Sequence, residues 1–219
     1  MTDIHAEAAL LMAAAQGAPA REHRAPLSGD GAGRLDLPSG ATHIHIGPDD
    51  DEARLFRATF IRAVAVSAVD GHRVAIGLSD HGGRLGGAEY LGRISLNTTI
   101  AWNVTLRGGA SHVTADLAAL RVNAVTITGG SSHLDLTLPP PTDIVPVTLG
   151  AGASHVTVRR PAGVATRLRV RMGASHVTFD QQQLGAVGGE LVLSTPGFDQ
   201  ALDRYEIEVN GGASQLVVA

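Results

Sequence analysis

The sequence predicts an all-β protein: a β-solenoid, or β-helix, of two-strand units about 21 residues long, with a short N-terminal helix. Three observations predict it. The motif Gly-Ala-Ser-His-Val-Thr, or a close variant, recurs along the chain. Apolar and polar residues alternate on both sides of each motif, which is the period of a β-strand. A unit this short cannot bury its apolar face alone, so neighbouring units are expected to stack.

The motif glycines set the period of the repeat. Three successive spacings are 21, 22 and 21 residues, and the outer spacings of 69 and 39 residues are close to three and two units. Degenerate units are therefore expected in those two gaps. The six motifs begin at Gly40, Gly109, Gly130, Gly152, Gly173 and Gly212.

Each unit predicts a strand, a turn and a second strand. Around Gly152, for example, Val147 and Leu149 precede the glycine, and Val156 and Val158 follow it. The glycine is expected to take a positive φ or a tight corner there. An antiparallel meander or sandwich of hairpins remains the alternative, since it uses the same alternation.

The N-terminal segment differs from the repeats. Residues 3–16 are rich in alanine and predict a helix that Gly17 ends, either as a cap on the stack or as a docking helix. Residues 17–33 contain prolines and glycines and predict a linker. The expected organisation is thus an N-terminal helix and linker, residues 1–33, followed by a β-repeat domain, residues 34–219.

The first long gap between motifs is less regular. Phe56–Ala68 and Arg73–Leu78 predict strands on either side of a turn at Val69-Asp70-Gly71. Ser79–Gly87 is glycine-rich and predicts a loop.

Composition excludes several classes of function. A net charge of −4 and an aromatic content of 3% argue against nucleic-acid binding. The absence of cysteine and lysine excludes thiolate and Schiff-base chemistry. No apolar segment reaches the ~18 residues of a membrane span, and the N-terminus lacks the basic flank of a signal peptide. A cytoplasmic protein without a cofactor is expected.

Several stretches resemble the LiaF-like, or toast-rack, domains of bacterial cell-envelope stress proteins. The resemblance spans about residues 34–219 and rests on short segments, among them 101–106, 115–120, 134–139, 161–165 and 201–209. It implies a β-helical fold without catalytic residues. In that family the domain often follows membrane-spanning helices and bears on envelope-stress signalling. No such helices occur in this sequence, so a soluble regulatory or scaffold role is the expectation.

Histidine occupies one position in four successive motifs. In a solenoid these side chains are expected to point outward and to stack at about 4.8 Å. A structural ladder is the favoured interpretation, and a pH-responsive face or a metal site is the alternative, because imidazoles bind transition metals. The four residues are His112, His133, His155 and His176.

Ser154, His155 and Asp135 are the residues from which a Ser-His-Asp triad of a hydrolase could be built. Adjacent strand residues face opposite ways, and no strand-to-helix nucleophile elbow is present, so a triad is not predicted. Acidic clusters of the kind used by carbohydrate-acting enzymes are also missing from the recurring outward positions.

Arginines concentrate on one segment and are the candidate partner-binding residues. Their guanidinium groups could bind a carboxylate or phosphate of a partner, while solubility and edge protection are the alternative roles. They are Arg159, Arg160, Arg167, Arg169 and Arg171.

The sequence therefore predicts a non-catalytic binding or scaffold module that acts through a protein partner or through self-association. A filament that polymerises end to end is the alternative, and a carbohydrate-acting β-helix enzyme is a third hypothesis. The sequence does not identify a small-molecule ligand.

Overall fold

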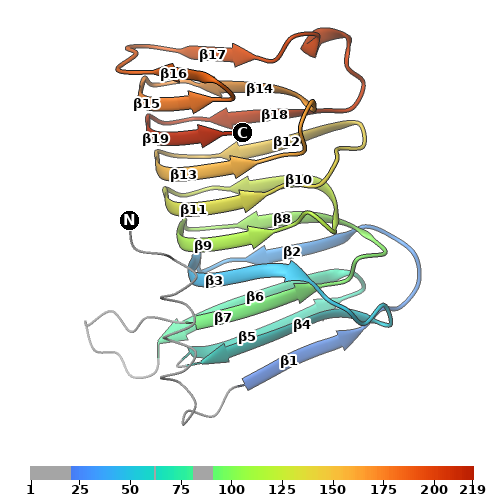
Figure 1. The fold of residues 1–219 in the computed structure, drawn as a ribbon. Coiled ribbons are helices and arrows are strands. Elements are labelled where there is room, and N and C mark those ends of the chain that lie inside the picture. Colours follow the sequence, from blue (N-terminus) through green and yellow to red (C-terminus); the bar gives the residue numbers. More distant parts are fainter. Residues whose placement is uncertain (1–20, 62, 81–90) are drawn as a thin grey trace.

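The computed structural model describes residues 21–61, 63–80 and 91–219. The helix expected at residues 3–16 and most of the loop expected at Ser79–Gly87 lie outside these residues. Within them the chain forms two sheets and one short 3-10 turn, η1 (Phe198–Gln200), as Figure 1 shows. No helix among the described residues is long and apolar enough to cross a membrane.

The first sheet carries the motif histidines and is called here the histidine sheet. Its ten strands lie in the order β1 (Arg21–Pro26), β4 (Arg54–Ile61), β7 (Leu91–Leu96), β3 (Ala41–Pro48), β9 (Ala110–Asp116), β11 (Ser131–Thr137), β13 (Ala153–Arg159), β19 (Ala213–Val218), β15 (Ala174–Phe179) and β16 (Gln182–Leu184).

The second sheet is called the arginine sheet, because most of the arginine ion pairs lie on it. Its nine strands lie in the order β17 (Leu191–Ser194), β14 (Ala165–Val170), β18 (Arg204–Val209), β12 (Ile144–Leu149), β10 (Arg121–Ile127), β8 (Ala101–Leu106), β2 (Gly33–Leu37), β6 (Arg73–Asp80) and β5 (Ala63–Asp70).

Each repeat unit forms one rung, with one strand in each sheet and the motif turn between them. Equivalent residues of neighbouring rungs pair in parallel: Ser131 of β11 pairs with Ala110 of β9 and with Ala153 of β13. The expected all-β fold is confirmed as two largely parallel sheets, the arrangement of a β-solenoid. The purely antiparallel meander is excluded, because the strands of neighbouring motif rungs pair in parallel. Antiparallel pairs involve β1, β4 and β5 near one end of the stack and β16 and β17 at the other.

The rungs do not stack in the order of the sequence. The C-terminal rung, β18 and β19, lies between the rung of β12 and β13 and the rung of β14 and β15. Similarly, the rung of β2 and β3 lies between β6 and β7 on one side and β8 and β9 on the other. Figure 1 shows the red C-terminal strands between yellow and orange ones.

The two long gaps between motifs contain partly degenerate units, as expected, but these stack outside the motif rungs. The strand expected at Phe56–Ala68 is divided into β4 and β5, and β5 forms a hairpin with β6 through Gly71, whose φ is +56°. Residues 21–26, within the segment interpreted as a linker, form β1 and pair with β4.

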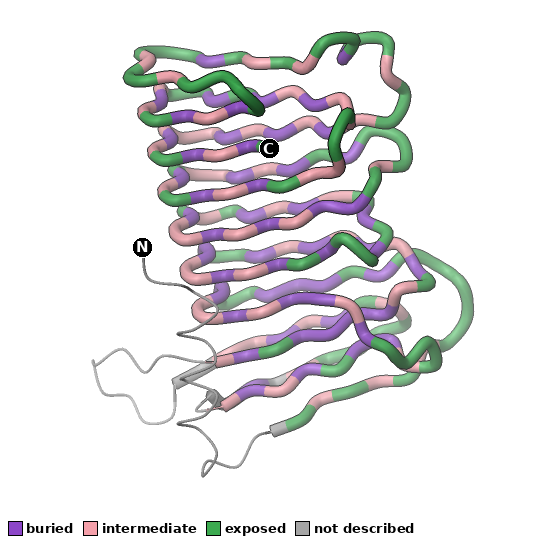
Figure 2. Tube along the Cα trace, viewed as in Figure 1, coloured by how far each residue is buried: buried purple, intermediate pink, exposed green. Residues whose placement is uncertain are grey.

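The core lies between the two sheets, where alternate residues of every rung are buried (Figure 2). Trp102 of β8 is fully buried and donates a hydrogen bond from its indole nitrogen to the carbonyl oxygen of Asn97 at 2.8 Å. Tyr205 of β18 is also fully buried, and its hydroxyl donates to the carbonyl oxygen of Pro139 at 2.6 Å. Burial raises the pKa of that hydroxyl, so it keeps its proton at neutral pH.

Candidate functional site

The residue at the motif-histidine position interrupts its strand in every rung that carries the motif. His112, His133, His155 and His176 have φ between 51° and 54°, in the left-handed region, and so does Gln215 at 51°. Non-glycine residues seldom adopt this region, although histidine is among the more tolerant. None of these residues is paired across the ladder, whereas the residues before and after them are. The motif is therefore a bulge that repeats from rung to rung.

The bulge brings the serine and the histidine of one motif to the same side of the sheet. The Oγ of Ser111 lies 3.0 Å from Nδ1 of His112, and the Oγ of Ser154 lies 2.8 Å from Nδ1 of His155. The expectation that adjacent strand residues point to opposite sides is wrong here, because the left-handed residue breaks the alternation. Asp135, the third residue weighed for a triad, instead forms an ion pair with Arg159.

The imidazole rings stack along the sheet. The centroids of His112 and His133 are 4.6 Å apart with an interplanar angle of 4°, and those of His133 and His155 are 4.7 Å apart at 7°. The ring of His43 lies 4.6 Å from that of His112 but is tilted by 57°, so His43 flanks the parallel stack. His176 is not next to His155, because β19 and its Gln215 lie between their strands. The ladder expected from the sequence thus has a gap.

These side chains form one surface, which we call the histidine face. It carries no formal charge while the imidazoles are neutral, and it extends across six parallel strands of the sheet. It consists of Thr42 and His43 on β3, Ser111 and His112 on β9, Ser132 and His133 on β11, Ser154 and His155 on β13, Ser214 and Gln215 on β19, and Ser175 and His176 on β15.

The stacking geometry presents the ring nitrogens side by side, whereas a metal ion needs ligands that converge on one point. Among the residues that the structure describes, no group of three or more histidine, aspartate or glutamate side chains could hold a metal ion. The four histidines named as candidate ligands are thus not brought together as a chelating set.

His133 has a histidine on each side, and both neighbours affect its pKa. Its pKa is lowered by desolvation and, to a smaller extent, by the charges that His112 and His155 acquire on protonation. The unfolded chain then binds a proton at His133 more readily than the folded chain does. Stability should consequently fall as the pH drops through the unfolded value of about 6.5, and the loss should end below the folded pKa.

We expect His133→Gln to reduce this pH dependence. Gln215 already occupies the equivalent position with the same backbone conformation, so the substitution should be tolerated. The measurement is the free energy of unfolding by urea between pH 7.5 and 5 for the wild type and the variant. His176→Gln is the matched control, since Gln215 separates His176 from the stack. Equal slopes for wild type and His133→Gln would contradict the coupling.

The five candidate arginines all have acidic partners within the chain. Arg167 binds Asp199 at 2.7 Å and lies 4.1 Å from the centre of the Phe198 ring. Arg169 binds Glu190, and this bond holds the pKa of Glu190 below its usual value. The remaining pairs are Arg171 with Glu208, Arg160 with Asp180 and Arg159 with Asp135. The predicted cluster is therefore a set of ion pairs and not an open basic surface.

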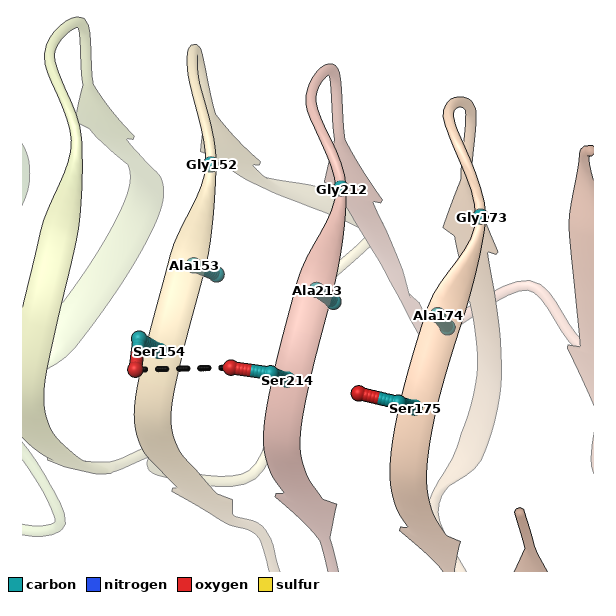
Figure 3. Close-up of a pocket in the computed structure, with 9 residues that line it drawn as sticks. All are labelled: Gly152, Ala153, Ser154, Gly173, Ala174, Ser175, Gly212, Ala213 and Ser214. Atoms are coloured by element: carbon teal, nitrogen blue, oxygen red, sulfur yellow. Dashed lines mark hydrogen bonds between the residues drawn. The ribbon is translucent and has the colours of Figure 1, made fainter. Parts of the chain in front are cut away.

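A shallow groove adjoins the histidine face at the motif turns. It has a volume of about 420 Å³ and is lined by the Gly-Ala-Ser segments at the start of β13, β19 and β15. Figure 3 shows the three serines in a row, with the hydroxyl of Ser214 donating to that of Ser154 at 3.4 Å. The groove exists because the interleaved C-terminal rung brings these three motifs together.

Comparisons with known proteins identify the fold. No known protein-family profile matches the chain, and no curated protein matches its sequence. The resemblance to LiaF-like domains thus finds no support there. A crystal structure of a proposed cell adhesion protein from Clostridium sporogenes ATCC 15579 aligns with a TM-score of 0.67 and 16% identity. The alignment covers 92% of this chain and 100% of that one, so the two share a fold.

A second solved structure, a proposed adhesin from Bacteroides fragilis NCTC 9343, aligns over 93% of this chain and 98% of that one. Its identity is 8% and its TM-score is 0.28, a score that carries no argument about this chain.

Proposed function

We propose that this chain is a non-catalytic binding module of the adhesion type, which contacts its partner through the histidine face. The observation that carries the proposal is the face itself: an uncharged, regularly spaced array of hydroxyl and imidazole groups across six parallel strands. The fold shared with a proposed cell adhesion protein supports the same role.

The two sheets differ in a way that favours this face. Outward residues of the arginine sheet are occupied by ion pairs, for example Arg169 with Glu190 and Arg171 with Glu208. Separating such pairs in order to bind a partner would cost their hydrogen bonds. The serine and histidine positions form no ion pairs among the described residues. The exposed side chains of the face, His155, His176 and Gln215, can therefore contact a partner without separating an ion pair.

The partner is a protein or another extended surface, because the face extends across six neighbouring strands and therefore fits a broad contact. A second copy of the chain satisfies the same geometry. This role implies a location where the chain meets another surface, in place of the cytoplasmic location expected from the N-terminal residues. Fractionation of the native cells reports on that location.

The test compares beads coated with the purified chain on epithelial cells and on bacterial cells. We expect the wild-type beads to adhere more than albumin-coated beads. His155→Glu combined with Gln215→Glu should reduce adherence at least fivefold, because it places two carboxylates on adjacent rungs of the face.

Thr126→Glu combined with Thr148→Glu is the matched control, since these residues pair on adjacent rungs of the arginine sheet. Its adherence should equal that of the wild type. The proposal fails if wild-type beads adhere no better than albumin-coated beads, or if both double variants reduce adherence equally. Native mass measurement over a concentration series identifies a second copy as the partner if the same face variant abolishes the oligomer.

A further inference from the structure

A second cavity lined by described residues lies away from the histidine face. It has a volume of about 880 Å³, within the range of about 300–1,000 Å³ that is usual for small-ligand sites. It is formed where the β13–β14 connection, the turn between β15 and β16 and the segment after β17 meet. Its lining includes Arg160, Val164, Asp180, Gln181, Gln182 and Pro196.

Arg160 lines this groove with a side chain that is almost completely buried. Its side chain is only 4% exposed, which is rare for arginine unless the charge is paired. The Nε donates to the hydroxyl of Thr166 at 2.6 Å, and one terminal nitrogen, Nη2, donates to both carboxylate oxygens of Asp180 at 2.9 and 3.0 Å. These bonds fix the guanidinium plane against the wall of the groove.

The other terminal nitrogen of Arg160, Nη1, is left as a donor. It forms no hydrogen bond with any described residue, and it is not among the enclosed polar atoms that lack a partner. Nη1 therefore keeps a small accessible surface, although the side chain as a whole is only 4% exposed. Asp180 adds an acceptor, since its side chain is 41% exposed.

The chemistry of the lining points to a neutral ligand. Among the described side chains that line the groove, Arg160 and Asp180 are the charged ones, and they cancel each other's charge, so a phosphate or carboxylate gains little from them. Gln181 and Gln182 each offer an amide donor and an amide acceptor from exposed positions. A hydroxyl group both donates and accepts hydrogen bonds, so neighbouring hydroxyls on one ligand can pair with the amide donors and the amide and carboxylate acceptors of this lining. Val164 and Pro196 supply apolar surface for carbon-bound hydrogens.

We infer that this groove binds a neutral, hydroxyl-rich ligand, a saccharide. A peptide fits less well, because an extended peptide would pair with a free sheet edge and this groove is formed by loops and turns. The site is separate from the histidine face and goes beyond the proposed function, which therefore does not depend on it.

The test uses an array of neutral oligosaccharides built from hexoses and N-acetylhexosamines. Sialylated and sulfated oligosaccharides and a random peptide library are probed in parallel with the purified full chain. We expect binding to at least one neutral oligosaccharide. Gln181→Ala combined with Gln182→Ala should weaken that binding at least tenfold, because two hydrogen-bonding amides are lost, while leaving the melting temperature unchanged.

Gln183→Ala is the matched control, because Gln183 is an exposed neighbour on β16 that does not line the groove. It should bind as the wild type does. Binding of anionic oligosaccharides or peptides alone overturns the inference, as does no binding or equal binding by the double variant. If beads coated with the double variant still adhere to cells, the proposed function stands even where this inference fails.

Discussion

Replacing Gly129 with alanine is expected to destabilise the chain by about 3 kcal/mol, which is large for a single methyl group. A Cβ at this position would lie 2.5 Å from the backbone nitrogen of Gly109 and 2.7 Å from the carbonyl carbon of Gly108. Both atoms belong to the backbone of the neighbouring rung and cannot move aside without shifting the stack. Thermal unfolding should show a melting temperature lower by about 6–12 °C.

Gly130→Ala is the control, because it alters the next residue of the same turn. Its Cβ would meet only the carbonyl oxygen of Gly152, at 3.8 Å, which is ordinary contact. We expect its melting temperature to stay within about 3 °C of the wild type, the shift for less than about 1 kcal/mol. Equal destabilisation by the two substitutions would show that close stacking of the turns is not what selects glycine.

This pair of residues corrects an expectation drawn from the sequence. The sequence predicts a positive φ or a tight corner at the motif glycines, and Gly40, Gly109 and Gly173 do have a positive φ. Gly152 has none, and a Cβ there would lie 3.5 Å from its nearest neighbour. In that rung the left-handed residue is His155, three positions later. The steric demand instead falls on the glycine that precedes the motif, as at Gly129 and Gly211.

Removing residues 201–219 is expected to detach the rungs that follow β13. β18 and β19 pair on both sides, with β12 and β14 in one sheet and with β13 and β15 in the other. Their loss leaves four strand edges unpaired and removes buried side chains that include Tyr205, Ile207 and Leu216. Because each rung contacts mainly its neighbours, the rungs before the gap should remain folded.

Hydrogen–deuterium exchange measures this loss by segment. Amides of β14 and β15 should lose most of their protection in the truncated chain, while those of β9 and β11 keep theirs. Adding a peptide of residues 201–219 should restore protection, which serves as the control for misfolding. Retained protection of β14 and β15 would contradict the expectation, since it would mean that they close directly onto β12 and β13.

The repeat could be read from the sequence because its cause is local. Alternating apolar residues such as Val147 and Leu149 are buried as expected, and the parallel pairing follows from their fixed offset from each motif. The order of the rungs could not be predicted. The spacing between Gly152 and Gly173 is 21 residues, the same as between Gly109 and Gly130, although one pair of rungs is separated by another and the other is not.

The histidine bulge is visible in the sequence as a break in the alternation of apolar and polar residues, which a search for strict period two does not detect. Ala153 and Val156 are both buried, yet they stand three residues apart. A small apolar residue three positions before the next buried one breaks the alternation once per unit and places Ser154 and His155 on one side. The acidic partners of the arginines could not be found in this way, because Glu190 and Asp199 are brought near Arg169 and Arg167 only by the return of the chain through β17.

The interleaved C-terminal rung makes the histidine face one continuous surface. Engineered disulfides test it directly, because the natural chain has no cysteine. Ser154 and Ser214 lie on adjacent strands with their hydroxyl oxygens 3.4 Å apart, whereas Ser154 and Ser175 are separated by β19. Adjacent strands place Cα atoms about 4.8 Å apart, within disulfide range, and two spacings of about 9.6 Å exceed it.

The measurement is the extent of disulfide formation under mild oxidation, determined by mass spectrometry on the folded chain. Ser154→Cys combined with Ser214→Cys should oxidise to a disulfide, and Ser154→Cys combined with Ser175→Cys should remain reduced. The reverse outcome, a disulfide between positions 154 and 175 and none between 154 and 214, would show that the rungs stack in sequence order. Gln215 would then lie outside the row formed by His155 and His176, and the continuous face described here would not exist.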